Sequence, residues 1–247
     1  MTWTEDIVPG GLHLRSVLDA ASCPSSRFCL AVGGGSDGDP PAVAAVTTVA
    51  GRTWTPVHLP AGLFYLYGVS CASEDACEAL GWARGARVLI VTRDAGVSWR
   101  VERVPTRFAL STIACPSEKV CYLGGFDQAG SVVLVTVDAG ASWREETLPG
   151  GQWSIWDLAC LSVGDCVAVG TRSQNVEFGA PGEIAGLVNR TGDGGVVVTT
   201  SNGGVTWHVE PIPSGIDGLF GVSCPSVTVC YASGSNDNAG AVILKRA

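Results

Sequence analysis

The sequence predicts an all-β chain built from five copies of one four-stranded unit. The ten cysteines fall into five pairs whose partners are six positions apart, and a tryptophan followed six residues later by a proline recurs five times in phase with them. Glycine supplies 33 of the 247 residues, about twice the usual share, so the chain turns often. The apolar runs are short and bounded by turn residues, which is typical of strands rather than helices.

Each cysteine pair brackets a short turn, as in the string SCPSSRFC. Cysteines that face each other across a short hairpin can reach disulfide distance. We therefore expect five local disulfides: Cys23–Cys29, Cys71–Cys77, Cys115–Cys121, Cys160–Cys166 and Cys224–Cys230. The alternative is five pairs of buried thiols. Zinc-ligand spacing is missing, because the sequence holds no Cys-x-x-Cys and only three histidines.

The cysteines also bear on the compartment. Five disulfides would indicate an oxidising environment, and hence a secreted or otherwise exported protein. The chain begins MTWTED, without the charged and apolar regions of a signal peptide. Export would therefore require that a signal peptide has been removed and that Met1 is not native. If the cysteines prove reduced, the expected location is the cytoplasm.

The repeat length points to an architecture. Five units in 247 residues give a period of about 49, which is in the range of β-propeller blades of four strands each. We expect one domain spanning 1–247, with a period beginning after each Trp–Pro step, at about 10–60, 61–105, 106–149, 150–213 and 214–247. Residues 241–247 align with a third strand and residues 1–9 with a fourth. The N-terminal strand would then complete the last blade and close the ring.

The strings before the tryptophans carry a family resemblance. Residues 92–99 read TRDAGVSW and residues 136–143 read TVDAGASW. Both resemble the Asp-box, S/T-x-D-x-G-x-[TS]-W, of the BNR-repeat β-propellers, which include sialidases, sortilin-type receptors and photosystem II assembly factors. The resemblance implies a structural turn between the third and fourth strands, and it says little about activity. Asn202 replaces the aspartate in a third copy, and the copy at 47–54 has lost it.

Composition excludes several classes of partner. Acidic residues number 23 and basic residues 15, for a net charge of −8, which disfavours nucleic acid. No apolar run approaches the roughly 18 residues of a membrane helix, so we expect no membrane insertion. The oxygen-rich segments at 36–39 and 236–238 lack the ligand spacing of calcium loops and are interpreted as turns. We expect no metal, no cofactor and a monomer.

The candidate site follows from what varies between the copies. The cysteine turns and the Asp-box-like turns should share one end of the sheets, and the segments at the other end differ from copy to copy. An insertion at about 171–195 in the fourth copy lies there too and should partly cover the site. Aromatic side chains gather in these variable segments, as do an arginine and several carboxylates. The expected ligand-binding residues are Phe64, Tyr65, Tyr67, Trp82, Arg107, Phe108, Phe126, Trp153, Trp156 and Phe220.

Three functions fit this pattern. The first is the binding of a carbohydrate or another small, partly apolar ligand by stacking on the aromatic rings. The second is an enzyme, either like a glycoside hydrolase, which needs two carboxylates at a set separation, or a lyase or cyclase. Its candidate residues are Asp19, Asp157, Asp217, His13 and Glu177. The third is a protein-interaction scaffold, for which we expect an open, flat surface instead of a covered one.

Overall fold

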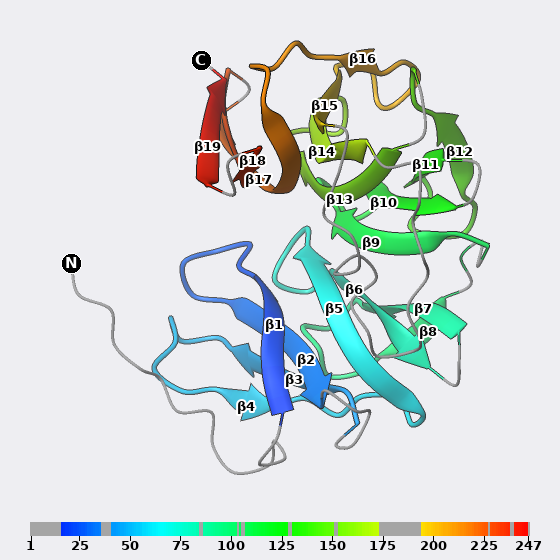
Figure 1. Cartoon of the computed structure of the whole chain (residues 1–247). Helices are drawn as coiled ribbons and strands as arrows, with labels where there is room; N and C mark the ends of the chain where they lie inside the picture. The colour runs from blue at the N-terminus through cyan, green and yellow to red at the C-terminus, as the bar shows by residue number, and fades with distance from the viewer. Residues whose placement is uncertain are drawn as a thin grey trace. The chain divides into compact units, whose positions relative to one another are not determined.

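The computed structural model describes residues 16–35, 41–83, 86–102, 104, 107–127, 130–150, 153–172, 194–226, 228–237 and 240–246. The chain divides into two compact units, residues 1–104 and 105–247. Every regular element in the described ranges is a β-strand, and the strands pair antiparallel with their neighbours (Figure 1). The predicted all-β class is therefore confirmed.

The first unit holds two meanders of four strands. The first repeat comprises β1 (Ser16–Ser22), β2 (Cys29–Gly35), β3 (Val43–Thr47) and β4 (Thr55–Pro56). The second comprises β5 (Leu63–Cys71), β6 (Cys77–Ala83), β7 (Ala86–Thr92) and β8 (Arg100–Glu102). Gly34 on β2 pairs with Tyr65 on β5, which links the two meanders into one sheet.

The second unit holds three further sheets. The third repeat comprises β9 (Ala109–Ala114), β10 (Cys121–Asp127), β11 (Gly130–Thr136) and β12 (Arg144–Thr147). The fourth comprises β13 (Trp153–Cys160), β14 (Cys166–Arg172), β15 (Gly195–Thr200) and β16 (His208–Val209). The fifth comprises β17 (Ile216–Ser226), β18 (Val229–Asn236) and β19 (Ala241–Arg246). The expected completion of this last sheet by residues 1–9 lies outside the described residues.

Apolar side chains hold neighbouring sheets together inside each unit. In the second unit one cluster joins Val133 of the third repeat to Ile155 of the fourth, and another joins Val169 of the fourth to Leu219 of the fifth. The residue five positions before each first cysteine is fully or almost fully buried in four repeats, but the equivalent Leu18 in the first repeat is 39% exposed.

All five expected disulfides are present, and they account for all ten cysteines. Each joins the end of the first strand of a repeat to the start of the second, with Cα atoms 4.0–4.2 Å apart. Because every sulfur is bonded to another, no thiolate is available to hold a metal ion.

Every first strand carries a β-bulge four residues before its first cysteine. The residue there has no partner in the register of the neighbouring strand, while the residues on both sides do. The five bulge residues are Asp19, Tyr67, Ser111, Trp156 and Phe220. A bulge bends the strand and redirects a side chain, so these positions are the ones at which each repeat can differ without disturbing the ladder.

A glycine on the second strand makes each bulge possible. It lies four residues after the second cysteine and opposite the residue that precedes the bulge, as Gly170 lies opposite Ile155. A β-carbon on Gly170 would lie 2.0 Å from the carbonyl oxygen of Ser154, and the equivalent glycines face a carbonyl oxygen at 1.8–2.5 Å. Only glycine permits this approach, and the equivalents are Gly33, Gly81, Gly125 and Gly234.

Candidate functional site

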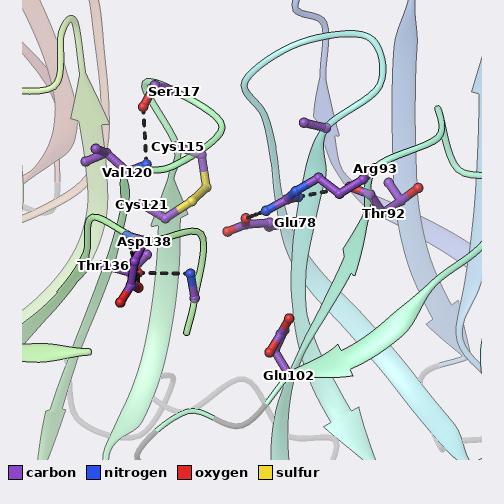
Figure 2. Close-up of polar contacts among 12 residues, drawn as sticks. Glu78, Thr92, Arg93, Glu102, Cys115, Ser117, Val120, Cys121, Thr136 and Asp138 are labelled. Carbon is purple, nitrogen blue, oxygen red and sulfur yellow. Dashed lines mark hydrogen bonds and ion pairs between the residues drawn. A yellow bond between two sulfur atoms is a disulfide. The ribbon is translucent and has the colours of Figure 1, made fainter. Parts of the chain in front are cut away.

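In the first four repeats, one end of the sheet is built from two turns that bond to each other. The backbone N–H of Ala139, in the turn between β11 and β12, donates to the carbonyl of Lys119 in the cysteine loop at 3.0 Å. The same bond recurs from Ala50 to Arg27, from Ala95 to Asp75 and from Gly203 to Gly164. Figure 2 shows the Cys115–Cys121 disulfide and the Thr136–Asp138 turn. The two kinds of turn thus share one end of a repeat, as the sequence predicted.

The aspartate in these turns holds the loop closed. Asp138 accepts the backbone N–H of Ser142 at 2.9 Å and the hydroxyl hydrogens of Ser142 and Thr136. These bonds favour the charged form and hold the pKa of Asp138 at about 2. Asp94 makes the same set of bonds, with Thr92 and Ser98. The role of both carboxylates in these bonds is structural.

In the second repeat, the end that holds the two turns also contains an ion pair. The guanidinium of Arg93 donates to the carboxylate of buried Glu78, with 2.6 Å between the nitrogen and the oxygen (Figure 2). Burial raises the pKa of Glu78, and the bond to Arg93 opposes that rise. Arg93 stands between Thr92 and Asp94, so the pair fastens the turn to β6.

The opposite end of the first unit carries an aromatic cluster. Tyr65, Trp82 and Arg87 are register partners across β5, β6 and β7, so their side chains share one face of the sheet. The guanidinium carbon of Arg87 lies 4.7 Å from the centroid of the Trp82 ring, in a cation–π contact. All three side chains are half-buried. The expected residues Tyr65 and Trp82 are thus brought together.

Two more residues complete this cluster, which we call the Tyr–Trp–Arg cluster (Asp19, Tyr65, Tyr67, Trp82 and Arg87). The Tyr65 hydroxyl bonds to the Asp19 carboxylate, and burial together with this bond raises the pKa of Tyr65. Burial raises the pKa of Tyr67 to about 12, although the charge of Arg87 opposes that shift. Both phenols therefore keep their protons at neutral pH, and the Tyr65 hydroxyl donates its hydrogen to Asp19.

The second unit gathers a less polar set at the corresponding end. The rings of Phe126 and Trp156 meet edge to face, with centroids 5.6 Å apart and an angle of 63°. The indole N–H of Trp156 donates to the hydroxyl of Thr171 at 3.0 Å. Phe220 is 38% exposed, and its ring lies against Gly218, which faces Thr171. Trp156 and Phe220 are both bulge residues.

Several expected binding residues lie in the protein interior. Phe108, Phe126 and Trp153 are 3%, 1% and 3% exposed, and Trp153 belongs to the core between the third and fourth repeats. Arg107 lies over the Phe108 ring, with its guanidinium carbon 4.3 Å from the centroid, and forms an ion pair with Glu145. Phe64 is 40% exposed. The place of an aromatic residue in the repeat does not by itself separate a core ring from a surface ring.

The candidate carboxylates differ in their surroundings. Asp157 accepts the backbone N–H groups of Leu158 and Val222, both at 2.8 Å, and the hydroxyl hydrogen of Thr112 at 3.0 Å. Burial nevertheless raises its pKa. Asp217 is hydrogen-bonded to the carboxyl of Asp237, and loss of solvation and this neighbour raise the pKa of Asp217. His13, Glu177 and nearly all of the insertion at 171–195 lie outside the described residues.

Two features of the structure were not predicted from the sequence: the contact of Arg87 with Trp82 and the five glycines opposite the bulges. The glycines had a signal in the sequence, because the second cysteine of each pair begins a Cys-x-x-x-Gly string. Arg87 had none beyond its charge, because its place beside Trp82 depends on the pairing of β6 with β7. In the described part of the chain, no helix has the length and hydropathy to cross a membrane.

Comparison with known proteins identifies the class of fold. No protein-family model and no curated protein matches the chain. Among solved structures, a GH74 enzyme of Niastella koreensis is 14% identical over 93% of this chain with a TM-score of 0.70, and the GH74 xyloglucanase of Xanthomonas campestris is 16% identical over 92% with a TM-score of 0.64. The chain spans 36% of the length of each.

Two further structures extend the comparison. YCF48 bound to a D1 peptide is 15% identical, covers 95% of this chain and 93% of its own, and has a TM-score of 0.50. The WD40 repeats of RRP9 are 17% identical over 90% of this chain and 58% of their own, with a TM-score of 0.61. At such identities the likeness shows the fold alone. The chain is a β-propeller protein, and the function has to come from the site.

Proposed function

We propose that the chain is a non-catalytic binding propeller that takes a carbohydrate at the Tyr–Trp–Arg cluster. The observation that supports this most is the register of Tyr65, Trp82 and Arg87, which puts two aromatic rings and a guanidinium on one face of the sheet. Sugar rings have apolar C–H faces that stack on aromatic rings and hydroxyl rims that need hydrogen-bond partners. Asp19, Arg87 and the two phenols supply such partners of both kinds.

The GH74 neighbours are consistent with a carbohydrate. One of them is a xyloglucanase, so this fold can serve glycan chemistry in another protein. We further propose that the repeats are five blades and that the Thr-x-Asp turns are Asp-boxes of the BNR type. The hydrogen bonds of Asp94 and Asp138 support the second point. The five disulfides indicate an oxidising compartment, and we propose that the protein is exported.

Titration calorimetry with a panel of soluble oligosaccharides tests the binding proposal. Trp82→Ala removes the ring that joins Tyr65 to Arg87 and should weaken binding by about 1–3 kcal/mol. Asp94→Ala is the matched control, because Asp94 lies in the same unit but at the turn end; it should lower the melting temperature and leave affinity nearly intact. Equal affinity of Trp82→Ala and the unaltered protein would place the ligand elsewhere.

A peptide ligand is the second candidate. It is favoured by the likeness to YCF48, whose structure holds a D1 peptide and whose length this chain nearly matches. A peptide would bind through backbone amides and apolar side chains, for which Phe220 and Trp156 in the second unit are suited. Binding that is lost on Phe220→Ala but kept on Trp82→Ala would favour the peptide.

A hydrolase is the third candidate, and it depends on Asp217 and Asp237. Loss of solvation and the hydrogen bond to Asp237 raise the pKa of Asp217, which is the direction that a general acid needs. Release of reducing ends from any bound oligosaccharide, abolished by Asp217→Asn, would replace the non-catalytic proposal with this one.

A further inference from the structure

We propose that the outer edge of β19 is a docking surface for residues 2–9 of the same chain, which add to it as an antiparallel fourth strand with Thr4 opposite Lys245. This inference is independent of the carbohydrate proposal. It rests on the open edge of β19, on the register of the fourth strands in the other repeats, and on the charges of the two segments.

The outer edge of β19 has no neighbour among the described strands. The fifth sheet has the order β17-β18-β19, whereas in each of the other four repeats a fourth strand pairs with the third. None of the six residues of β19 is buried, and Ile243 is 75% exposed, while the equivalent Leu89 and Val133 are 0% exposed. An open strand edge presents unpaired N–H and C=O groups, so it can pair with a further strand.

The sequence holds one segment of the kind that fills this place in the other repeats. In the first four repeats the fourth strand begins immediately after the repeated tryptophan, as β12 begins after Trp143 and β16 begins after Trp207. The remaining Trp–Pro step, at residues 3–9, precedes β1 and lies outside the described residues. Five third strands and five Trp–Pro steps therefore leave β19 and residues 3–9 unmatched.

The register of the added strand follows from the four fourth strands that the structure describes. In each of them, the residue after the tryptophan pairs with the third-strand residue that precedes the one opposite the second cysteine. In the third repeat, for example, Arg144 follows Trp143 and pairs with Val135, and the next residue, Thr136, lies opposite Cys121. The same rule holds in the first, second and fourth repeats.

Applied to the fifth repeat, this rule fixes one pairing. Arg246 lies opposite Cys230, so the preceding residue, Lys245, pairs with Thr4, which follows Trp3 in the sequence. Antiparallel pairing then puts the next two residues, 5 and 6, opposite residues 244 and 243 of β19. A slip of one residue would turn every side chain of the added strand to the other face, so the register can be tested directly.

Charge and residue type agree with this register. Residues 2–9 hold two acidic residues and no basic one, whereas β19 ends in two basic residues and holds no acidic one. In the inferred register Asp6 and Lys245 are diagonal neighbours on one face of the sheet, at a separation that long side chains can span. The third position after the tryptophan, which Asp6 occupies, is also acidic in three described repeats, where it is Glu102, Glu146 and Glu210.

A cysteine cross-link tests both the docking and its register. Directly opposed residues of an antiparallel pair have Cα atoms about 4.5–5.5 Å apart, which is within disulfide range. Thr4→Cys combined with Lys245→Cys should therefore form a sixth disulfide inside one chain, detected as a further loss of about two hydrogens by intact mass and located by peptide mapping. Glu5→Cys combined with Lys245→Cys is the matched control. It should stay unbridged, because the side chain at position 5 points to the other face.

Each other outcome of the cross-link contradicts part of the proposal. A covalent dimer would show that the strand on β19 comes from a second copy and not from the same chain. Bridging of the Glu5 pair in place of the Thr4 pair, or of both equally, would overturn the register. No bridge in either variant would overturn the docking.

Hydrogen exchange of the unaltered protein provides a second measurement that needs no substitution. Peptides from residues 2–9 should exchange their amide hydrogens at least about tenfold more slowly than an unstructured chain of the same sequence, because a paired strand protects its N–H groups. Exchange of residues 2–9 at the unstructured rate would overturn the docking even if the cysteine variants failed to fold.

Discussion

The carboxylate of Asp157 on β13 accepts the backbone N–H of Val222 on β17 at 2.8 Å, across 65 positions of the sequence. The same carboxylate also binds Thr112 on β9, so one side chain joins the third, fourth and fifth repeats. Every hydrogen bond that Asp157 accepts comes from a neighbouring strand or from its own. This arrangement explains why a carboxylate can be tolerated at a half-buried position between strands.

Removing that carboxylate should destabilise the second unit. Asp157→Ala leaves the Val222 N–H and the Thr112 hydroxyl without their acceptor, and each such loss costs about 1–3 kcal/mol. Asp157→Asn should be nearly as harmful if its amide nitrogen faces the Val222 N–H. Urea unfolding measures the effect, and an unchanged midpoint in Asp157→Ala would show that the carboxylate is not structural.

The bulge glycines should be intolerant of alanine. In Gly170→Ala the new β-carbon would lie 2.0 Å from the Ser154 carbonyl oxygen, so the strands must separate or the bulge must be lost. We expect insoluble protein or a loss of several kcal/mol, since backbone cannot move aside cheaply. Gly164→Ala in the same sheet is the control, because its nearest neighbour is an ordinary 3.5 Å away. Similar melting temperatures for the two variants would contradict the steric argument.

Asp138 should contribute to the acid sensitivity of folding. Its pKa in the folded protein is about 2, below the ordinary value of about 3.9 for an aspartate. Because the folded pKa is lowered, the stabilisation is present above about pH 4 and is lost as the pH falls toward 2. Asp138→Asn should flatten this part of the stability profile measured by urea unfolding. Asn202 shows that the amide fits, since it accepts the Thr206 N–H at 3.0 Å in the equivalent turn.

Asp157 should change the pH dependence of folding stability in the opposite direction to Asp138. Burial raises its folded pKa above the ordinary value, so its contribution to stability is largest below about pH 4 and declines as the pH rises through the folded pKa. Comparing the pH profile of Asp157→Ala with that of Asp138→Asn should therefore reveal differences of opposite slope. Parallel profiles would show that one of the two pKa shifts has the wrong sign.

Substitutions of Trp153 and Phe220 should differ in how much they lower the stability of the fold. Trp153 is 3% exposed in the core, so Trp153→Ala should cost about 3–5 kcal/mol of stability. Phe220 is 38% exposed, so Phe220→Ala should change stability far less. Thermal unfolding provides the comparison. A larger loss in Phe220→Ala would mean that the exposed ring is the more important packing element.

The oxidised state can be measured directly. Protein from its native compartment, analysed by intact mass under non-reducing, denaturing conditions, should be lighter than the reduced chain by about ten hydrogens, two for each bridge. The detection of ten free thiols would remove both the disulfides and the proposal of export.

Local spacing explains how far the sequence could be interpreted. A pair of cysteines six positions apart predicts a tight hairpin, and the Thr-x-Asp-x-Gly string predicts a turn, because these contacts join residues close in the chain. The exposure of Leu18 and the burial of Trp153 were not predictable in this way, because both depend on which sheet lies alongside.

The sequence by itself determined the repeat, the disulfides and the all-β class, since each follows from the order of residues within one hairpin or one turn. Only the tertiary structure decided which variable residues meet. Tyr65, Trp82 and Arg87 are separated by 17 and 5 positions and gain their contacts from strand register, and Asp157 reaches Val222 across two sheets. Register is a property of paired strands, and a one-residue slip would turn every one of these side chains to the other face.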